Sequence, residues 1–527
     1  MAPQAFERLI LVAASLAVLA VAILAGIERP LWYDELYTYY VALQPTPGAT
    51  LRALLDGADN NPPVDYLLRQ ASMWALGPSD GAFRLPSALA FVAGLLALYA
   101  YVRRHGTALA AFTAFALPLG TLAMRFSYEG RGYALLFAAA AASLLAWQRA
   151  TERPTSLRHL ALLTGALTLG PFTHFYGVLN YLPVVAGEAW RSVQRRRIDR
   201  GIVAAIAVSA ATLPLLLPFA QNALKIKDRF WARDFNALTP VFHLEKLFGP
   251  AVIPAILALT AAFAVAVLLP ASAGGGAGRR ADASPAATTS GRRRTHELVA
   301  TLVLAATPLS AYLLAELYTG ALTPRYTIAG VAGIALLVGL AATWVTDQSG
   351  RLSGLVVAVF AGSALALQLL SWAWQRGQPP VPDGVRAMLA SHADLPVAVD
   401  SPLTYLEYAH HLGPELGARL VYPMDAATAA AAYGENTPEI SLRGLQRVTA
   451  LDLRDYGDFV TATPRFYLLA SRDRSRALAI CLLKDGYRLE LRAESSGLML
   501  LLATPPDPAS ATGPPACRDG AVQSSTQ

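Results

Sequence analysis

The sequence predicts an α-helical polytopic membrane protein with a C-terminal extracytoplasmic α/β domain, and three observations lead to this fold class. The chain has 527 residues, of which 54% are hydrophobic and only 15% are charged, which is less charge than a soluble globular protein carries. Its apolar residues gather in runs long enough to cross a bilayer, and its mean hydropathy is +0.40. Beyond residue 371 these runs stop, and short alternating patterns typical of strands begin.

The apolar runs predict about eleven transmembrane helices, each about 17–22 residues long. They lie near residues 9–27, 86–102, 107–124, 132–148, 158–173, 176–190, 201–220, 250–270, 298–317, 327–345 and 353–371. The first run resembles a signal peptide, but its length and the weak basic region before it favour a retained anchor.

Lysine and arginine residues gather in alternate loops, and this asymmetry orients the spans because cytoplasmic loops are enriched in them. The basic loops lie at 103–104, 149–158, 191–200, 279–294 and 351. That side is predicted to be cytoplasmic, so the loop 221–249 and everything after residue 372 face outward. The net charge of +7 mostly reflects these loops. Nucleic-acid binding is disfavoured because lipid-spanning runs separate the basic clusters.

Three regions follow from these patterns. Residues 1–371 form the predicted transmembrane domain, with 28–85 as the first extracytoplasmic loop and 271–296 as a disordered cytoplasmic loop rich in small and basic residues. Residues 372–505 form a predicted soluble α/β domain, and residues 506–527 a disordered tail. The strands of the soluble domain are expected near 396–400, 419–422, 465–470, 487–492 and 498–503.

An adjacent acidic pair, Asp34 and Glu35, directly follows the first span, within an aromatic segment that includes Tyr33. Aromatic residues alone are typical of a membrane interface. Carboxylates at this boundary are costly to place next to lipid, so they need another reason. A general base acting on a lipid-borne substrate would supply one, which makes Asp34 and Glu35 candidate catalytic residues.

Basic side chains on the predicted outward side are a second unusual feature, because the positive-inside rule disfavours them there. They are Arg125, Arg131, Lys225, Lys227, Arg229, Arg233, Lys246 and Arg325. Such cations either extend to anionic headgroups or converge on a phosphate ligand. Both interpretations stay open for the loop 221–249, whereas binding of a ligand is favoured for Arg131 and Arg325.

Two further polar features have ordinary structural explanations. Asn61 precedes Pro62 and Pro63, which form a rigid turn that also suits a plain helix start. His174 lies at an outward helix end, where a lone histidine is more often a structural hydrogen-bonding group than a ligand or an acid.

The C-terminal segment carries its own candidates. His410 and His411 have no further ligand at metal-binding spacing, so we expect them at the surface. Cys481 and Cys517 both fall on the outward side, where an oxidising compartment permits a disulfide, and whether they pair is left open.

The order of these motifs resembles the GT-C glycosyltransferases, and among them the bacterial relatives of protein O-mannosyltransferase and of the lipid A aminoarabinose transferase. The resemblance extends over residues 5–345 and is specific in the segments 32–40 and 127–136. A Pro-Pro motif before the second span, His-aromatic after the fifth and Pro-Arg-Tyr before a late span complete it. The C-terminal domain contributes nothing to it.

The resemblance implies a multi-pass protein of the bacterial inner membrane whose active site faces outward. Its donor would be a polyprenyl-phosphate-linked sugar, and its acceptor a hydroxyl of an envelope glycan, a lipid or a protein. Asp34 resembles the family's catalytic base, and Glu35 a neighbour that binds the acceptor or a cation. The substrate-binding candidates are Tyr33, Asn61, Glu129, Arg131, Tyr133, His174, Lys225, Lys227, Arg325 and Tyr326.

One departure from the family's pattern concerns Asn61, because the family often has histidine before the paired prolines. Asparagine can form hydrogen bonds but cannot titrate or bind a metal comparably. No cofactor is firmly implied, no metal ligands are assigned, and a divalent cation is left open.

The residue types suit a hexosyl- or pentosyltransferase. A base would deprotonate the acceptor while arginines stabilise the departing phosphate, and one displacement would invert the anomeric carbon. The alternative is a carrier or flippase of lipid-linked sugars that makes no bond, although transporters usually show inverted repeats and polar groups near the midplane. A third interpretation is a non-catalytic scaffold of the cell envelope.

Overall fold

The computed structural model describes residues 3–225, 230, 232–249, 295–346, 379–423, 427, 429–430, 436–472 and 477–506. The chain divides into two compact units. Unit 1 comprises residues 1–27, 81–217 and 235–374, and unit 2 comprises residues 28–80, 218–234 and 375–527. The spans predicted at 250–270 and 353–371, most of the loop 271–296, nearly all of the tail and Lys227 lie outside the described residues.

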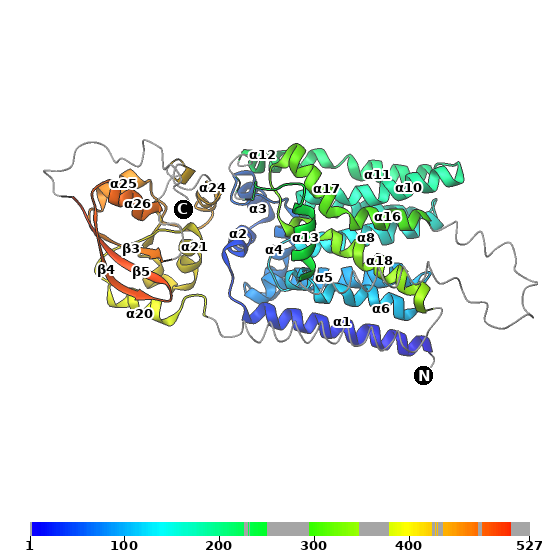
Figure 1. Ribbon diagram of the computed structural model, residues 1–527, viewed down its shortest axis with the longest axis horizontal. Coiled ribbons are helices and arrows are strands. Elements are labelled where there is room, and N and C mark those ends of the chain that lie inside the picture. The colour runs from blue at the N-terminus through cyan, green and yellow to red at the C-terminus, as the bar shows by residue number, and fades with distance from the viewer. Residues whose placement is uncertain are drawn as a thin grey trace, which may run out of the picture. The chain divides into compact units, whose positions relative to one another are not determined.

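Unit 1 is helical, and its helices run side by side as a bundle (Figure 1). Its elements are α1 (Pro3–Glu28), α5 (Asp80–Arg103), α6 (Ala108–Ala116), η1 (Leu117–Gly120), α7 (Leu122–Phe126), α8 (Tyr133–Glu152), α9 (Leu157–Thr173), η2 (Phe175–Asn180), α10 (Tyr181–Arg195), α11 (Arg200–Ala210), η3 (Leu213–Leu216), α13 (Thr239–Phe248), α16 (Thr295–Ala305), α17 (Thr307–Leu314), η6 (Ala315–Thr319), η7 (Pro324–Thr327) and α18 (Ala329–Thr346). Helix α8 packs against α9 and α18, and α10 packs against α16.

Except for α13, which lies in the predicted outward loop 221–249, the described α-helices of unit 1 lie at predicted apolar runs, and proline interrupts some of these runs. The run 107–124 is divided into α6, η1 and α7, with Pro118 in η1. The run 298–317 bends by 54° between α16 and the helix that follows, where Pro308 stands in the first turn. Within the described ranges, four helices are long and apolar enough to cross a membrane, or five if the bent pair is one span. The number of eleven spans stays a prediction.

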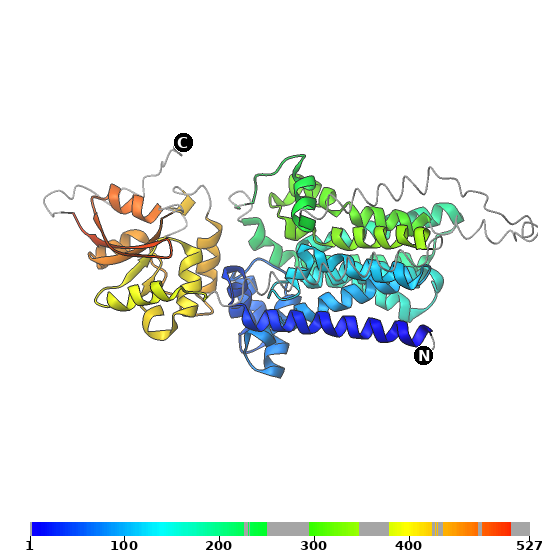
Figure 2. The same cartoon turned by 60° about the horizontal axis from the view of Figure 1, so that its bottom comes forward.

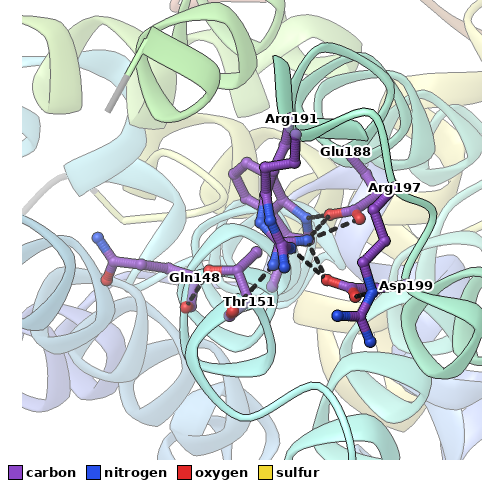
Figure 3. Close-up of polar contacts among 8 residues, drawn as sticks. Gln148, Thr151, Glu188, Arg191, Arg197 and Asp199 are labelled. Carbon is purple, nitrogen blue, oxygen red and sulfur yellow. Dashed lines mark hydrogen bonds and ion pairs between the residues drawn. The ribbon is translucent and has the colours of Figure 1, made fainter. Parts of the chain in front are cut away.

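A buried ion-pair network joins the ends of α8, α10 and α11 (Figure 3). Arg191 Nη1 lies 2.9 Å from Glu188 Oε1 and 2.6 Å from Asp199 Oδ2. Arg191 Nη2 donates to the carbonyl of Thr151 at 3.0 Å, and the Trp147 indole donates to Glu188 at 3.0 Å. Because the last carbonyls of a helix lack intrahelical partners, Arg191 caps the end of α8 while it also forms ion pairs with two carboxylates.

Unit 2 combines the first predicted loop with the C-terminal segment, and the sheet can be followed in Figures 1 and 2. Its elements are α2 (Tyr33–Ala42), α3 (Pro47–Leu55), α4 (Val64–Leu76), α12 (Leu217–Lys225), α20 (Asp383–Ser391), β1 (Val397–Val399), α21 (Pro402–His411), α22 (Gly413–Gly417), β2 (Leu420–Val421), α24 (Thr437–Leu445), α25 (Tyr456–Ala462), β3 (Phe466–Ser471), α26 (Ala477–Lys484), β4 (Arg488–Ser495) and β5 (Leu498–Thr504).

The small sheet of unit 2 has the strand order β2-β1-β3-β5-β4. Strands β2, β1 and β3 are parallel, whereas β3, β5 and β4 pair antiparallel. Ser496 and Gly497, with φ values of 51° and 75°, make the tight turn between β4 and β5, because two-residue hairpin turns need positive φ. The strands lie close to the positions expected from the alternating patterns.

Candidate active site

The predicted site residues fall in both units. Unit 1 holds Glu129, Arg131, Tyr133, His174, Arg325 and Tyr326, and unit 2 holds Tyr33, Asp34, Glu35, Asn61 and Lys225. Each of these two groups of residues therefore lies within a single unit.

The turn between α7 and α8 carries Glu129 and Arg131, and both side chains are buried. Gly130 is required between them because a Cβ atom there would lie 2.0 Å from Cε1 of Phe83 on α5. The hydroxyl of Ser87, also on α5, donates to the carbonyl of Glu129 at 2.7 Å. Close packing and this hydrogen bond therefore fix the backbone from which Arg131 extends.

His174 lies in the turn between α9 and η2, outside both predicted spans. The chain turns sharply here because Gly170 and Gly177 are in contact, and a Cβ on Gly177 would lie 2.1 Å from the carbonyl carbon of Gly170. Nδ1 of His174 accepts a hydrogen bond from the backbone N–H of Tyr176 at 3.2 Å, so the side chain caps η2. A neutral imidazole that accepts at Nδ1 carries its hydrogen at Nε2.

Three tyrosine rings form one aromatic cluster with His174. Its ring centroid lies 4.8 Å from that of Tyr326 and 5.6 Å from that of Tyr133. The rings of Tyr176 and Tyr326 are 5.0 Å apart. The guanidinium carbon of Arg325 lies 5.6 Å from the centroid of Tyr133, which is within cation–π range.

The surroundings of this cluster favour an anion. Burial, followed by the positive charges of Arg131 and Arg325, lowers the pKa of His174 to about 3, so the ring is neutral at about pH 7. Glu129, the acid of the same turn as Arg131, forms an ion pair with Arg125, with Nε and Oε2 3.4 Å apart. We call Arg131, Tyr133, His174, Arg325 and Tyr326 the basic-aromatic cluster. Two guanidinium groups and a neutral Nε2–H donor suit the oxygens of a phosphate.

The acidic pair begins α2 in unit 2, and its two carboxylates have different environments. Glu35 is fully buried, and its Oε2 atom accepts from the backbone N–H of Trp32 at 3.4 Å. Glu35 is thus placed as a cap for the first turn of α2. Asp34 is only half-buried, which makes it the more accessible of the two carboxylates.

Tyr33 and Tyr37 stand one turn apart on α2 and form a buried phenol pair. Their hydroxyl oxygens are 2.9 Å apart, and their rings meet edge to face with centroids separated by 5.1 Å. Burial raises the pKa of both phenols well above the usual value, so both are donors at neutral pH. We call residues 31–40 the acidic segment. Thr38, the residue after Tyr37, donates to Asp59 at 3.5 Å and so connects this segment to the start of the Asp-Asn-Asn-Pro-Pro motif.

The two remaining candidates of unit 2 have less distinctive environments. Asn61 is half-buried immediately before the prolines. Lys225 is exposed at the end of α12 and donates to Asn222 at 3.1 Å, while Asn222 donates to the carbonyls of Leu54 and Leu55.

Three residues of α21 that the sequence did not single out for function contact the acidic segment. Oε1 of Glu407 accepts from the backbone N–H of Tyr33 at 2.8 Å. Nδ1 of His410 is hydrogen-bonded to the Tyr40 hydroxyl at 2.8 Å, and Nε2 of His411 donates to the Leu31 carbonyl at 2.8 Å.

The expectation that His410 and His411 are surface residues was therefore wrong, since both are partly buried against the first loop. No local signal could have predicted this, because their partners lie about 370 residues away in the sequence. Among the described residues, no group of three or more His, Cys, Asp or Glu side chains is arranged to hold a metal ion.

Residues 60–220 match the family model described as dolichyl-phosphate-mannose-protein mannosyltransferase. The chain has no significant match among the curated proteins.

Solved structures show the same fold. ArnT from Cupriavidus metallidurans in the apo state is 14% identical, with a TM-score of 0.57 over 98% of this chain and 100% of that chain. The same protein bound to undecaprenyl phosphate gives a TM-score of 0.57 at 14% identity, over 97% of this chain and 100% of that chain. An oligosaccharyltransferase of Archaeoglobus fulgidus is more distant, with 12% identity over 92% of this chain and 74% of that chain, and its TM-score of 0.48 supports no argument. The resemblance to the GT-C glycosyltransferases is confirmed at the level of fold.

Proposed function

We propose that this chain, which has the GT-C glycosyltransferase fold, transfers a sugar from a polyprenyl-phosphate-linked donor to a hydroxyl acceptor. The acceptor would belong to an envelope glycan, a glycolipid or a protein on the extracytoplasmic side of a bacterial inner membrane. The match to a mannosyltransferase family over residues 60–220 supports the reaction class. The shared fold with ArnT, solved with undecaprenyl phosphate bound, supports the class of donor.

The basic-aromatic cluster of unit 1 is the single observation that carries this proposal. Arg131 is buried and Arg325 is half-buried, and the positive charges of both act on the neutral ring of His174. The phosphate of the donor would bring negative charge to this place, and Arg binds phosphate through two parallel hydrogen bonds. The neutral His174 would add a donor from Nε2 without adding a third charge.

The reaction would be a single displacement. The acceptor hydroxyl passes its proton to the carboxylate of Asp34 as its oxygen attacks the anomeric carbon. The bond between that carbon and the phosphate oxygen breaks, and polyprenyl phosphate leaves with the electron pair. Arg131 and Arg325 would stabilise the charge that grows on the departing phosphate, and attack from the opposite face inverts the anomeric configuration.

The buried carboxylate beside Asp34 supports the choice of base. Glu35 is committed to the first turn of α2, where it accepts from the N–H of Trp32. Asp34 stands in the same turn but is only half-buried, so an acceptor could reach it. We therefore assign proton transfer to Asp34 and the support of its backbone to Glu35.

Two features support an outward-facing C-terminal segment. Cys481, buried on α26, is disulfide-bonded. Disulfides persist in oxidising compartments and are rare in the cytosol. The basic loops lie on the opposite side in the predicted topology.

The deciding experiment is transfer by the purified full-length chain in lipid nanodiscs. Polyprenyl-phosphate sugars of several kinds would be supplied with envelope glycolipids as acceptors, and product would be followed by mass spectrometry. We expect release of polyprenyl phosphate that depends on Asp34, with an inverted anomeric centre in the product. Movement of the intact donor between leaflets, with no bond broken, would instead identify a flippase.

A further inference from the structure

Helix α21 of the C-terminal segment contacts the acidic segment at three points within unit 2. Glu407 accepts from the backbone N–H of Tyr33 at 2.8 Å. His411 donates to the carbonyl of Leu31 at 2.8 Å. These two contacts lie on either side of Trp32, where the chain enters α2. A third contact joins His410 to the hydroxyl of Tyr40, in the last turn of α2. The acidic pair therefore begins a helix that is held along its length.

Glu407 provides a hydrogen-bond acceptor for the first turn of helix α2. The first N–H groups of a helix have no intrahelical acceptor. The residue before α2 is Trp32, whose side chain has no acceptor atom to offer. Glu35 accepts from the N–H of Trp32, and Glu407 accepts from the N–H of Tyr33. A carboxylate at this end also interacts favourably with the helix dipole.

Helix α24 holds the other parts of the first loop. The Tyr37 hydroxyl donates to the carbonyl of Pro438 at 3.4 Å. The side chain of Asn60 donates to the Ser441 hydroxyl at 3.3 Å. Gly444 is in contact with the loop backbone, because a Cβ on it would lie 2.1 Å from the carbonyl oxygen of Gly57. The C-terminal segment thus contacts the first loop on both sides of its acidic motifs.

We propose that helices α21 and α24 of the C-terminal segment position the first loop, and with it the acidic segment, for catalysis. Glu407 is the main positioning residue. Glu407 acts through the backbone of Tyr33, the neighbour of Asp34. This role rests on the proposed function, because it assumes that Asp34 is the base. The C-terminal domain carries none of the GT-C motifs, and through this positioning role it would contribute to the reaction.

The magnitude expected for Glu407 follows from its geometry. Loss of a helix cap corresponds to about 2- to 30-fold in the equilibrium for local opening. A displacement of a reacting group by about 1 Å can lower a rate about 100-fold. We therefore expect Glu407→Ala to slow turnover by about 10- to 100-fold, while donor affinity stays close to that of the parent.

The test compares four full-length variants in nanodiscs. Glu407→Ala removes the acceptor, and Glu407→Gln keeps an acceptor oxygen and should restore most of the rate. His411→Ala removes the second contact, at Leu31. Glu415→Ala is the matched control, because Glu415 is an exposed acid on the neighbouring helix α22.

Hydrogen exchange of the segment 31–38 provides a readout that does not depend on activity. We expect exchange about 2- to 30-fold faster in Glu407→Ala and His411→Ala, slower turnover with retained donor affinity, and parent-like behaviour of Glu407→Gln and Glu415→Ala. Unchanged exchange in both contact variants would overturn the proposal, and so would faster exchange with unchanged turnover. A parent protein that transfers no sugar would overturn the proposed function instead, while exchange would still decide whether Glu407 holds the segment.

Discussion

The guanidinium of Arg325 lies over the ring of Tyr133, with its carbon atom 5.6 Å from the ring centroid. Tyr133 opens α8 directly after the turn that carries Arg131, whereas Arg325 comes from η7, nearly 200 residues later in the chain. After burial, the positive charges of Arg131 and Arg325 are the next causes that lower the pKa of His174, so both charges act on its ring. A single anion could therefore contact both.

Replacement of Arg131 or Arg325 by Gln should weaken donor binding by about 10- to 100-fold and slow release of the phosphate. The reason is that hydrogen bonds to charged groups contribute about 1.5–3 kcal/mol each. Lys should restore only part of the loss, because a point charge cannot copy a planar fork. Donor affinity and single-turnover rate of the four variants would check this. Arg52→Gln, an exposed arginine of α3, is the control. Unchanged donor affinity in both Gln variants would exclude these residues from the phosphate site.

Asp34→Asn should abolish transfer while the protein still inserts and binds donor. The amide has nearly the same size but cannot accept the acceptor's proton, so the rate should fall by about 100- to 10,000-fold. Single-turnover measurements with a saturating donor would isolate this step. Asp56→Asn is the matched control, because Asp56 is an exposed acid of the same loop. Near-normal turnover of Asp34→Asn would remove Asp34 from the mechanism.

The sequence predicted the parts of the fold that depend on local pattern. Apolar runs indicated the described helices of unit 1 apart from α13, which lies in the predicted loop 221–249, and alternation indicated the strands of the small sheet. The convergence of Tyr133, His174 and Tyr326 was available only through the resemblance to a family. No spacing rule brings together side chains from α8, the turn after α9 and η7, because their approach depends on tertiary packing.

Long-range polar contacts were the parts that the sequence could not predict. Glu407 reads as an ordinary acid on an amphipathic helix, yet its partner is a backbone N–H that lies 374 residues away. Arg191 belongs to a basic loop that signals orientation, yet it is the buried centre of an ion-pair network, whereas Arg195 in the same loop is 40% exposed. Composition does not distinguish these two arginines.

Arg191→Gln should therefore destabilise unit 1 far more than Arg195→Gln. Removing one partner of a buried ion pair costs about 3–5 kcal/mol, because Glu188 and Asp199 would keep buried charges that have lost their main counterion. Arg195 is 40% exposed, so its pair with the buried Asp199 should contribute less, closer to the value of about 0–1 kcal/mol that is typical of solvent-exposed pairs. Thermal unfolding of both variants in the same detergent would measure the difference. Equal midpoints would show that the network does not stabilise the bundle.

The His410 contact should make the stability of unit 2 depend on pH. Burial, with a smaller effect of His411, lowers the pKa of His410 to about 4. The usual value for histidine is about 6.5, so the folded state favours the neutral ring. This contribution is fully present above about pH 6.5 and is lost as the pH falls towards about 4. His410→Gln should flatten that part of the stability profile, as measured by thermal unfolding across the range. A variant profile as steep as that of the parent would contradict this assignment.

The predicted topology can be tested with single cysteines on the two proposed sides. Pro285→Cys lies in the basic loop between two predicted spans, and Pro380→Cys lies just after the last one. In intact cells an impermeant thiol reagent should label the cysteine at 380 and not the one at 285, because arginine-rich loops stay on the cytoplasmic side. Labelling at 285 after the cells are opened would show that the site is reactive, and the parent protein reports any labelling of the native cysteines. The reverse pattern would move the acidic loop to the cytoplasmic side. Asp34 could then not act on an acceptor outside the membrane, so this experiment tests the sidedness on which the proposed reaction depends.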